Sequence, residues 1–507
     1  MGTDAARVAG ADERGALNKR AVLLCSLWLA GHGAYCAPAC AAEAIARSDA
    51  PIARAPAPRH YERAALEELG LLALGLAQYF YNHEANSVDW DLSYDWPSLE
   101  QKLTGKAYAF DTNAFDTNFI THPASGTLYY LAARSNGLSL LASFGYAFTA
   151  STLWEFFGEY RERVSINDVL VTPLAGLALG EVSHAFGEHF SRSCAPLQRT
   201  LGLVLSPLDA LHDSIDAVHR QYPCAASAAR SNLSFSDVIL VQNQGRDDWH
   251  THMLYALSLA AEVSTLAPTQ LEQTEFFADG NVAEFAFEIA TGARGAPHLR
   301  LAALSLPFGA YSRSLSETAR LQELTVGALI ATEYERHDYD TRDERGDRLF
   351  LITFPGIGAR YRRVEPGVEL RLALDLGVSF GGADAFIRAG VDQLDSLTSV
   401  SRAHGYNHVA GFSVTPRLSL AVEDATWTLE ARSDRLFALR AFDRERAHGG
   451  SASETRRRAS VAFTYPRRSW LRLRLQTGLR ERGGSFLGKD GSALEYFATS
   501  GLELGSD

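Results

Sequence analysis

The sequence predicts an α+β protein, with an N-terminal helical domain followed by an antiparallel transmembrane β-barrel of about twelve strands. Two observations carry this prediction. The second half of the chain repeats long segments in which apolar and polar residues alternate. The first half has apolar residues at three- and four-residue spacings. The first pattern is typical of strands, whose successive side chains point to opposite faces, and the second is typical of helices.

The clearest strand runs from Val368 to Phe380. Every even-numbered residue in it is apolar, whereas Glu369, Arg371 and Asp375 occupy odd-numbered positions. A soluble strand usually has about 5–6 residues, and a strand that crosses a bilayer needs roughly 9–11. The length of this segment therefore predicts one face toward lipid and one face toward a polar lumen.

Similar alternation recurs at 285–289, 412–423, 427–432 and 471–476, with charged connections between such segments. We therefore predict that residues 231–507 form the barrel. A soluble β-rich domain with a polar exterior is the alternative. It is disfavoured because Arg and Glu alternate with Leu over such long segments.

The N-terminus has the pattern of an export signal. Lys19 and Arg20 precede the apolar stretch 21–30, and Ala39-Cys40-Ala41 fits the small residues that precede a cleavage site. We predict that residues 1–41 are a cleaved signal peptide and that residues 42–60 are a flexible mature N-terminus. A lipoprotein with a lipid on Cys36 or Cys40 is the alternative.

The cysteines bear on the redox compartment of the protein, and the charge limits its possible partners. Cleavage leaves Cys194 and Cys224, and we predict a disulfide between them because two cysteines in an oxidising compartment usually pair. Two free buried thiols are the alternative. The net charge is -12, and the absence of a long Lys/Arg run argues against nucleic acid as a partner.

Residues 61–230 are predicted to form the helical domain. Within it, Asp111-Thr112-Asn113 and Asp116-Thr117-Asn118 form a small duplication. Repeated Asp-x-Asn is found in calcium loops, but the glycine and the distal glutamate of an EF-hand are missing. We interpret the duplication as two Asx-type turns.

Two helices are expected in the apolar block that follows. Residues 135–154 carry no formal charge up to Trp154 and have the length of a membrane span. Their many small residues suit packing inside protein, so we predict that protein shields them. A second helix begins at Ser165 to Asp168, which have the form of a capping box, and Pro173 is expected to kink it or to delay its start.

This block resembles a bacterial family known as the domain of unknown function 3943. The resemblance lies in matching residues that occur in the same order, including His122-Pro123, Ala133-Arg134-Ser135, Ser151 to Glu155, Ser165 to Asp168, Thr172-Pro173 and Gly180-Glu181. Val164 departs from the pattern, where proline is expected. The resemblance implies an envelope protein of a Gram-negative bacterium and implies no activity.

The polar residues inside this apolar block are the candidate site residues. Buried charges need partners, so Arg134 is expected to pair with Glu155, Asp168 or Glu181. Such a network also includes Ser165 and Thr172.

A sharper interpretation makes the block an active site. His122 would be the base, Glu155 or Asp168 the orienting carboxylate, and Ser125, Ser135 or Ser165 the nucleophile. Glu181, His184 and Glu188 share one helical face, but the Glu-x-x-His spacing occurs once, so no metal is assigned. No cofactor is predicted.

Together these observations predict an outer-membrane protein with a structural, lipid-transport or small-solute-transport role. The helices are expected to plug the lumen or to cap its periplasmic mouth. The expected partners are outer-membrane lipid, the barrel-assembly machinery and an unidentified lipid or small molecule. One alternative is an envelope-lipid hydrolase or transferase with its site in the helical domain. Another is an inner-membrane helical protein with a periplasmic β domain. Whether the protein is an enzyme is left open.

Overall fold

The structure is a computed structural model of the whole chain. It describes residues 59–85, 96–191, 196–216, 229–243, 249–264, 273–278, 282–292, 298–317, 320–337, 347–384, 399–443, 452–486 and 488–506. The predicted signal peptide, most of the predicted flexible N-terminus, Cys194 and Cys224 lie outside these residues. The chain divides into two compact units, Met1–Pro58 with Phe186–Ser227 and Arg59–Ala185 with Ala228–Asp507.

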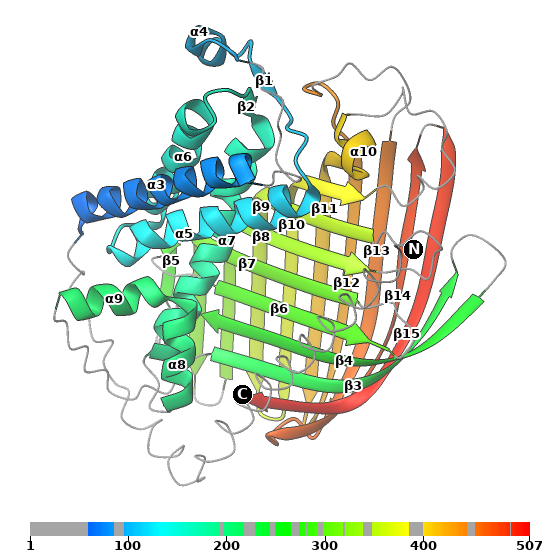
Figure 1. Cartoon of the computed structure of the whole chain (residues 1–507). Coiled ribbons are helices and arrows are strands. Elements are labelled where there is room, and N and C mark those ends of the chain that lie inside the picture. The colour runs from blue at the N-terminus through cyan, green and yellow to red at the C-terminus, as the bar shows by residue number, and fades with distance from the viewer. Residues whose placement is uncertain are drawn as a thin grey trace, which may run out of the picture. The chain divides into compact units, whose positions relative to one another are not determined.

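The second half of the chain is a closed barrel of twelve antiparallel strands, as the alternation predicts (Figure 1). Its first strand, β3, pairs with its last, β15, and the pairing of β7 with β8 closes the ring. β5 and β6 both pair with β7, so they lie end to end and together occupy one strand position in the ring. The strands are β3 (Ala229–Asn243), β4 (Trp249–Ser264), β5 (Gln273–Ala278), β6 (Val282–Thr291), β7 (His298–Glu317), β8 (Arg320–His337), β9 (Asp347–Glu365), β10 (Val368–Asp384), β11 (Tyr406–Val422), β12 (Ala425–Ala438), β13 (Ala452–Tyr465), β14 (Leu471–Phe486) and β15 (Lys489–Ser506).

The two faces of the barrel wall have the predicted polarity. On β10, Leu372, Leu374 and Leu376 are about two-fifths exposed, whereas Glu369 and Asp375 are 4% and 6% exposed. The leucines therefore face outward and the acids face the lumen. From Val368 to Val378 the outward row is apolar, which for a tilted strand gives a belt of about 25 Å.

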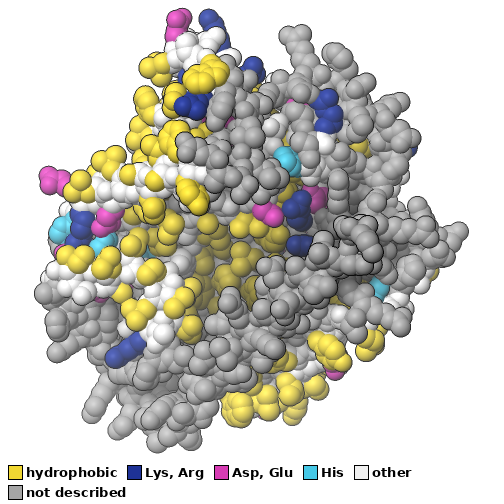
Figure 2. All heavy atoms as spheres, in the orientation of Figure 1, with side chains coloured by type: hydrophobic (Ala, Val, Ile, Leu, Met, Phe, Trp, Pro, Cys, Tyr) yellow, Lys and Arg dark blue, Asp and Glu magenta, His cyan; other side chains and the backbone are white. Residues whose placement is uncertain are grey.

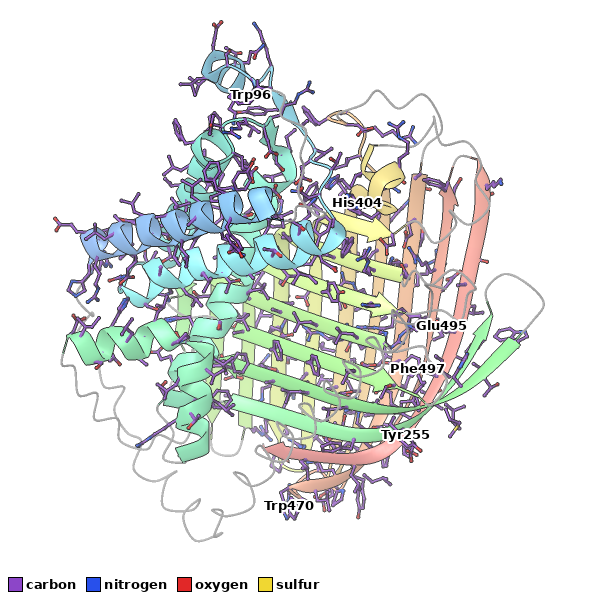
Figure 3. The ribbon with its side chains drawn as sticks, viewed as in Figure 1. Trp96, Tyr255, His404, Trp470, Glu495 and Phe497 are labelled. Carbon is purple, nitrogen blue, oxygen red and sulfur yellow. The ribbon has the colours of Figure 1, made fainter. Side chains whose placement is uncertain are left out.

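The two ends of the barrel differ in the length of their connections. Residues 318–319, 366–367 and 423–424 join strands at the end where β3 begins and β15 finishes. The connections 338–346, 385–405 and 439–451 at the other end are longer, and the middle one contains α10 (Ser399–His404). Figure 3 shows Trp470 at the end with short connections and His404 at the opposite end.

The helices precede the barrel in the chain. In the unit that contains the barrel they are α3 (Tyr61–Ala85), α4 (Leu99–Leu103), the π-helix η1 (Thr117–Thr121), α5 (His122–Ser135), α6 (Leu140–Leu153), the π-helix η2 (Trp154–Gly158) and the larger part of α7 (Ile166–Ser191). Two short strands, β1 (Tyr108–Ala109) and β2 (Val164–Ser165), pair in parallel. Pro173 lies inside α7, so of the two alternatives predicted for it, a kink or a delayed start, the delayed start is wrong.

The other unit contains the end of α7 with α8 (Pro196–Leu205) and α9 (Pro207–Ile215). A Cβ at Gly187 would lie 2.4 Å from that of Ser206, so glycine permits this close approach. Ser206 precedes α9 and donates from Oγ to Asp209 Oδ2 at 2.6 Å in the first turn. The local contacts thus set the turn between α8 and α9.

The helices of the barrel-containing unit pack on the outside of the barrel wall. Phe350 and Ile352 of β9 pair with Gly382 and Phe380 of β10, which continue the outward row of leucines. These β9 residues form one core with Phe115, Phe119, Val171 and Ala175 of the helical segment. The helices thus contact the outer face of β8 to β11 and not the lumen. These contacts therefore do not form the predicted helical plug.

The prediction that protein shields residues 135–154 is only half correct. Helix α6 buries Ser143, Ala147 and Ala150, but Leu141 and Phe148 are 64% and 42% exposed. Figure 2 shows apolar side chains gathered over these helices. The one described helix that is long and apolar enough to cross a membrane is Ile166–Ser191, and 67% of its most apolar window is buried. We infer that the small residues of α6 serve helix packing on one side only.

The seam between the first and last strands can be tested with cysteines. Ile239 on β3 lies directly opposite Ala498 on β15. In a chain whose five native cysteines are replaced by serine, we expect Ile239→Cys with Ala498→Cys to cross-link, because opposite Cβ atoms are about 5 Å apart. Non-reducing gel migration measures the link. Ile239→Cys with Leu502→Cys is displaced by about 13 Å along the strand and should not cross-link. A cross-link in Ile239→Cys with Leu502→Cys, but none in Ile239→Cys with Ala498→Cys, would contradict the register.

Candidate functional site

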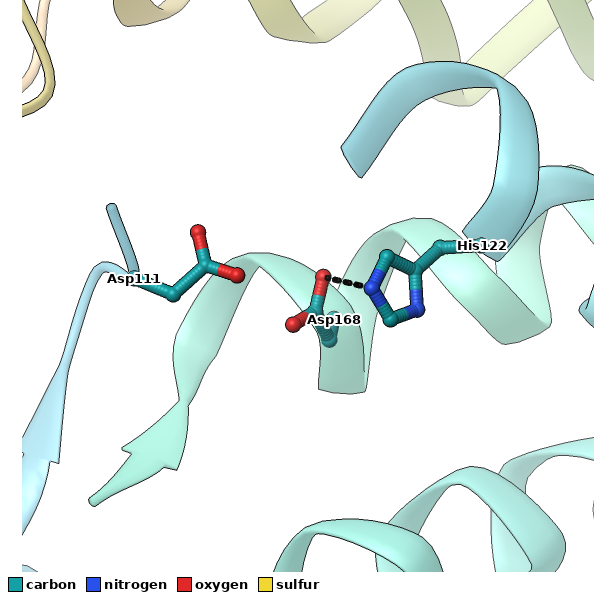
Figure 4. A group of neighbouring side chains, drawn as sticks. All are labelled: Asp111, His122 and Asp168. Atoms are coloured by element: carbon teal, nitrogen blue, oxygen red, sulfur yellow. Dashed lines mark ion pairs between the residues drawn. The ribbon is translucent and has the colours of Figure 1, made fainter. Parts of the chain in front are cut away.

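Three titratable side chains meet in the helical segment (Figure 4). One carboxylate oxygen from Asp111, one from Asp168 and a ring nitrogen of His122 all lie within 4.8 Å of one another. His122 Nε2 is 3.6 Å from Asp168 Oδ1. Asp111 and Asp168 are 5% and 2% exposed. Among the residues that the structure describes, this is the one His/Cys/Asp/Glu group with the spacing of metal ligands.

Local structure explains why these residues meet. The parallel pairing of β1 with β2 places Ala109 beside Ser165, so Asp111 comes next to the first turn of α7. Asp168 lies in that turn. His122 begins α5 directly after the π-helix η1. The pair of two-residue strands therefore holds together segments that are far apart in the chain.

Two asparagines orient the carboxylates. Asn118 Nδ2 donates to Asp111 Oδ1 at 2.6 Å and to the hydroxyl of Tyr406 at 2.8 Å. Asn167 Nδ2 donates to Asp111 Oδ1 at 3.1 Å and to Asp168 Oδ1 at 2.9 Å. Tyr406 belongs to β11, so the barrel wall contributes to the surroundings of the site.

The cap of α7 differs from the predicted capping box. Ser165 Oγ accepts from the Asp168 backbone N–H at 3.2 Å, as expected. The backbone N–H of Ser165, however, donates to Glu155 Oε2 at 2.8 Å. Glu155 thus takes the place predicted for the Asp168 carboxylate. The Asp168 side chain is left to face Asp111 and His122.

Burial dominates the electrostatics of the three residues. Burial and the nearby Asp168 raise the pKa of Asp111 well above its usual value. Burial also raises the pKa of Asp168 to about 6. Burial lowers the pKa of His122, although Asp111 opposes this shift. Two buried acids beside a histidine that favours its neutral form require either a shared proton or a cation.

The acidic surroundings extend beyond the three residues. Burial raises the pKa of Glu155 well above its usual value and that of Glu159 to about 8. The Lys102 ammonium lies nearby, but it donates to the backbone carbonyls of Glu155 and Glu159, at 2.7 and 3.0 Å. The region therefore buries more carboxyl groups than the Lys102 ammonium can neutralise.

The structure brings together only part of the predicted active site. His122 and Asp168 meet as proposed, whereas the Glu155 carboxylate binds the Ser165 backbone. The Ser165 hydroxyl donates to Asn167 Oδ1 at 2.9 Å. Asp111 was not among the predicted site residues. The sequence signal for Asp111 is the duplicated Asp-Thr-Asn. The structure distinguishes the two copies, since Asp111 is buried whereas Asp116 is exposed and pairs with Arg348 at 3.3 Å.

The predicted polar network forms around Glu181. Arg134 Nε lies 3.0 Å from Glu181 Oε2, and the Tyr130 hydroxyl donates to the same oxygen at 2.5 Å. Of the three acids proposed for Arg134, Glu181 is thus its partner. The Thr172 hydroxyl oxygen is buried without a hydrogen bond, so Thr172 is not part of this network. The backbone of Thr172 instead packs against Gly126, where a Cβ would lie 1.8 Å from the Thr172 carbonyl oxygen.

The second polar feature is the lumen, where ion pairs join strands on opposite sides of the ring. Arg417 on β11 reaches Glu284 on β6 at 2.5 Å, with β7, β8, β9 and β10 between these strands. Arg480 on β14 reaches Glu288 on β6 at 3.3 Å, with β15, β3 and β4 between them. These distances are possible only if the side chains extend across the lumen.

The same arrangement recurs around the lumen. Further pairs between non-adjacent strands are Arg360 with Glu284, Arg432 with Glu333, Arg482 with Asp347, Arg456 with Asp347, and His337 with Glu495. An apolar cluster fills another part, where Val238, Leu240, Leu254 and Phe497 pack together. Figure 3 labels Glu495 and Phe497 on β15. Phe497 is buried, so it faces the lumen and not lipid.

The cavities follow from this packing. Glu333, Asp347, Arg456 and Arg482 are among the residues that line a cavity of about 60 Å³ in the lumen. A second cavity, of about 30 Å³, lies by Ala383, Val409 and Leu436. None of Asp111, His122 and Asp168 lines either cavity. Both of these cavities, lined by described residues, are small.

A family comparison identifies the segment that contains the three-residue cluster. Residues 107–208 match the model of the family described as Domain of unknown function (DUF3943). The match covers about a fifth of the chain, and we refer to this segment as the DUF3943 domain. The match confirms the resemblance and includes Asp111, His122, Glu155, Asp168 and Glu181. No curated protein matches the chain.

Solved structures of outer-membrane proteins are also similar to the chain. Outer membrane phospholipase A from Escherichia coli has 9% identity and a TM-score of 0.23, over 54% of this chain and 92% of its own. The translocator domain of the autotransporter NalP from Neisseria meningitidis has 9% identity and a TM-score of 0.22, over 58% and 95%. The TodX monoaromatic hydrocarbon channel (deltaS2 mutant) has 9% identity and a TM-score of 0.21, over 56% and 91%.

Arg134 and Glu181 provide a test of the buried network in the DUF3943 domain. We expect Arg134→Met to lower the free energy of unfolding by about 3–5 kcal/mol, because Glu181 then loses its charged partner. Arg134→Met with Glu181→Met should lose clearly less, because no unpaired charge stays buried. Denaturant unfolding followed by far-UV circular dichroism measures both. A double variant as unstable as the single one would contradict this role.

Glu68 predicts a pH dependence. It lies on α3, is 5% exposed, and neither carboxyl oxygen has a hydrogen bond. Burial raises its pKa from 4.5 to about 9, so the folded chain keeps a proton that the unfolded chain releases. Stability should therefore fall by up to about 1.4 kcal/mol per pH unit as the pH rises from about 4.5 to about 9.

The variant Glu68→Gln isolates this effect. It should match the natural chain near pH 4 and unfold at a higher temperature at pH 8. Thermal unfolding at both pH values measures the difference. Glu62→Gln, in the first turn of the same helix, is the matched control and should leave the pH dependence unchanged. Equal behaviour of Glu68→Gln and the natural chain at pH 8 would contradict the argument.

Proposed function

We propose that the protein resides in the outer membrane of a Gram-negative bacterium and that its barrel is an anchor and scaffold for the DUF3943 domain. Support for the location comes from the barrel itself. Its outer wall carries a belt of exposed apolar residues, its lumen is polar, and the connections 318–319, 366–367 and 423–424 are short at the end where its barrel termini lie. This pattern is typical of bacterial outer-membrane barrels.

The ion pairs across the lumen carry the proposed role. A pore needs an open aqueous path, but here Arg417, Arg432, Arg480 and Arg482 each extend to an acid on a distant strand. One cavity between these side chains has a volume of about 60 Å³. We therefore assign a structural role to the barrel and not the conduction of solutes.

The external position of the helices supports the same assignment. Their contacts with the barrel use Phe350, Ile352 and Tyr406, all on the outer face of the wall. The barrel thus presents a firm surface on which the DUF3943 domain folds. Under this proposal the domain, and not the lumen, carries the protein's specific activity or binding.

Membrane fractionation and conductance test the proposal together. The expressed chain should be recovered with the outer membrane. In a planar bilayer, the purified chain should show no stable open-pore conductance, because the lumen is occupied. Arg417→Ser with Arg432→Ser should conduct, because two side chains that cross the lumen are shortened.

The matched control is Arg363→Ser with Arg468→Ser, which removes two exposed arginines and should leave conductance at the level of the natural chain. Heat-modifiable gel migration verifies that each barrel is folded. Stable conductance by the natural chain would favour a transport role over an anchor. Recovery with the inner membrane would contradict the location.

A further inference from the structure

We propose that Asp111, His122 and Asp168 bind a divalent transition-metal ion, for which zinc is the probe, and that this ion fastens the DUF3943 domain to the barrel wall. This inference does not depend on whether the lumen conducts. It starts from the position of three side chains that approach one point from three separate elements.

The separation of His122 from Asp168 suits two ligands of one ion, and Asp111 lies near both. Zinc lies about 2.0–2.2 Å from nitrogen and carboxylate oxygen ligands. Two ligands of such an ion are therefore separated by roughly 3.3–3.7 Å at angles near tetrahedral or somewhat wider. The His122 Nε2 to Asp168 Oδ1 distance is 3.6 Å, which is too long for a good hydrogen bond and falls in this range. The third ligand atom, from Asp111, lies within 4.8 Å of both.

A second observation concerns buried acceptor oxygens near the cluster. Asn118 is fully buried, and its amide nitrogen donates to Asp111, but its Oδ1 has no hydrogen-bond donor. Glu155, whose other oxygen binds the Ser165 backbone, also has a fully buried oxygen without a donor. The interior around the cluster thus holds an excess of acceptor oxygens. Unpaired buried acceptors and charges are costly unless a cation or a proton satisfies them.

The ligand types select the class of ion. Imidazole nitrogen suits zinc and other transition metals, whereas calcium and magnesium prefer sites made only of oxygen. One imidazole with two carboxylates leaves a fourth position of a tetrahedral ion for water or for another ligand. Asn167 holds Asp168 at 2.9 Å and Asp111 at 3.1 Å, which is the orienting role that outer-shell partners have in metal sites.

The ion would connect the helical segment to the barrel. Asp111 is joined through Asn118 to the hydroxyl of Tyr406 on β11, and this hydroxyl donates to the Asn113 carbonyl at 2.8 Å. An ion held by Asp111, His122 and Asp168 would fix the segment around 111–122 against the start of α7. Both would then be held against the outer wall through Tyr406. The expected role is structural.

The test uses the full chain in detergent, first freed of metal with a chelator. We expect the natural chain to bind one zinc ion, measured by calorimetry and by elemental analysis after gel filtration. Zinc should also raise the unfolding temperature and slow proteolysis between residues 105 and 123. Calcium should do neither. Asp111→Asn and His122→Gln should each weaken zinc binding by roughly 100-fold or more, beyond the loss typical of outer-shell changes.

Two controls are matched to these variants. Asp116→Asn alters the equivalent residue of the second Asp-Thr-Asn, and His184→Gln alters the histidine of the other acidic helical face. Both should bind zinc as the natural chain does. Heat-modifiable migration and the circular dichroism of the metal-free chains show that each variant is folded.

Two results would overturn the proposal. If the natural chain binds no zinc, the cluster is a pair of carboxyls that share a proton beside a neutral histidine. If Asp111→Asn and His122→Gln bind zinc as tightly as the natural chain, the ion lies elsewhere. Loss of binding only in His184→Gln would place it on the Glu181, His184 and Glu188 face.

Discussion

The ion pairs that cross the lumen are the interaction on which the rest of this structure depends. Every second residue of a strand faces the lumen, and in this barrel many of these residues are polar or charged. An unpaired charge there would be costly in free energy. Arg417 with Glu284 and Arg480 with Glu288 satisfy each other from opposite sides of the ring. Because these pairs tie distant strands together, they restrain the cross-section of the barrel, and their side chains extend across its lumen. Under the proposed location, the outer face is then free to contact both lipid and protein.

The outer wall of β8 to β11 shows how one surface serves two environments. Toward the end with short connections, its apolar row is exposed, as on Leu372 and Leu374. Toward the other end, Phe350 and Ile352 pack with Phe119 of the helical segment. The change needs no change in strand chemistry, since both lipid and a protein core accept apolar side chains. The packing of the helical segment on this wall brings the buried acidic cluster close to the barrel. There the Tyr406 hydroxyl takes part in the hydrogen bonds around the cluster.

The sequence was most informative where a pattern repeats. Alternation over 368–380 predicted the barrel and its polarity, and the apolar helical pattern placed His122, Arg134, Asp168 and Glu181 in one domain. It left Glu155, Asp168 and Glu181 as alternative partners of Arg134. It could not show that Phe350 lies under helices, because an outward phenylalanine has the same pattern beside lipid. Asp111 and Tyr406 were missed for another reason. The duplicated Asp-Thr-Asn marks Asp111, but its contacts depend on a parallel pairing of two-residue strands, and those of Tyr406 on a segment almost 300 positions away, which local sequence patterns do not encode.

The mixed core around Phe115 and Phe119 has a consequence for the family segment itself. Four residues of that core come from the helical segment, and the others come from the barrel strands β9 and β11 and from α10. Residues 107–208 alone would expose these phenylalanines to water. The DUF3943 segment in this chain therefore shares this core about equally with the barrel wall and α10. Any chain that carries such a segment with the same aromatic pair must supply a comparable surface, either from its own sequence or from a second polypeptide.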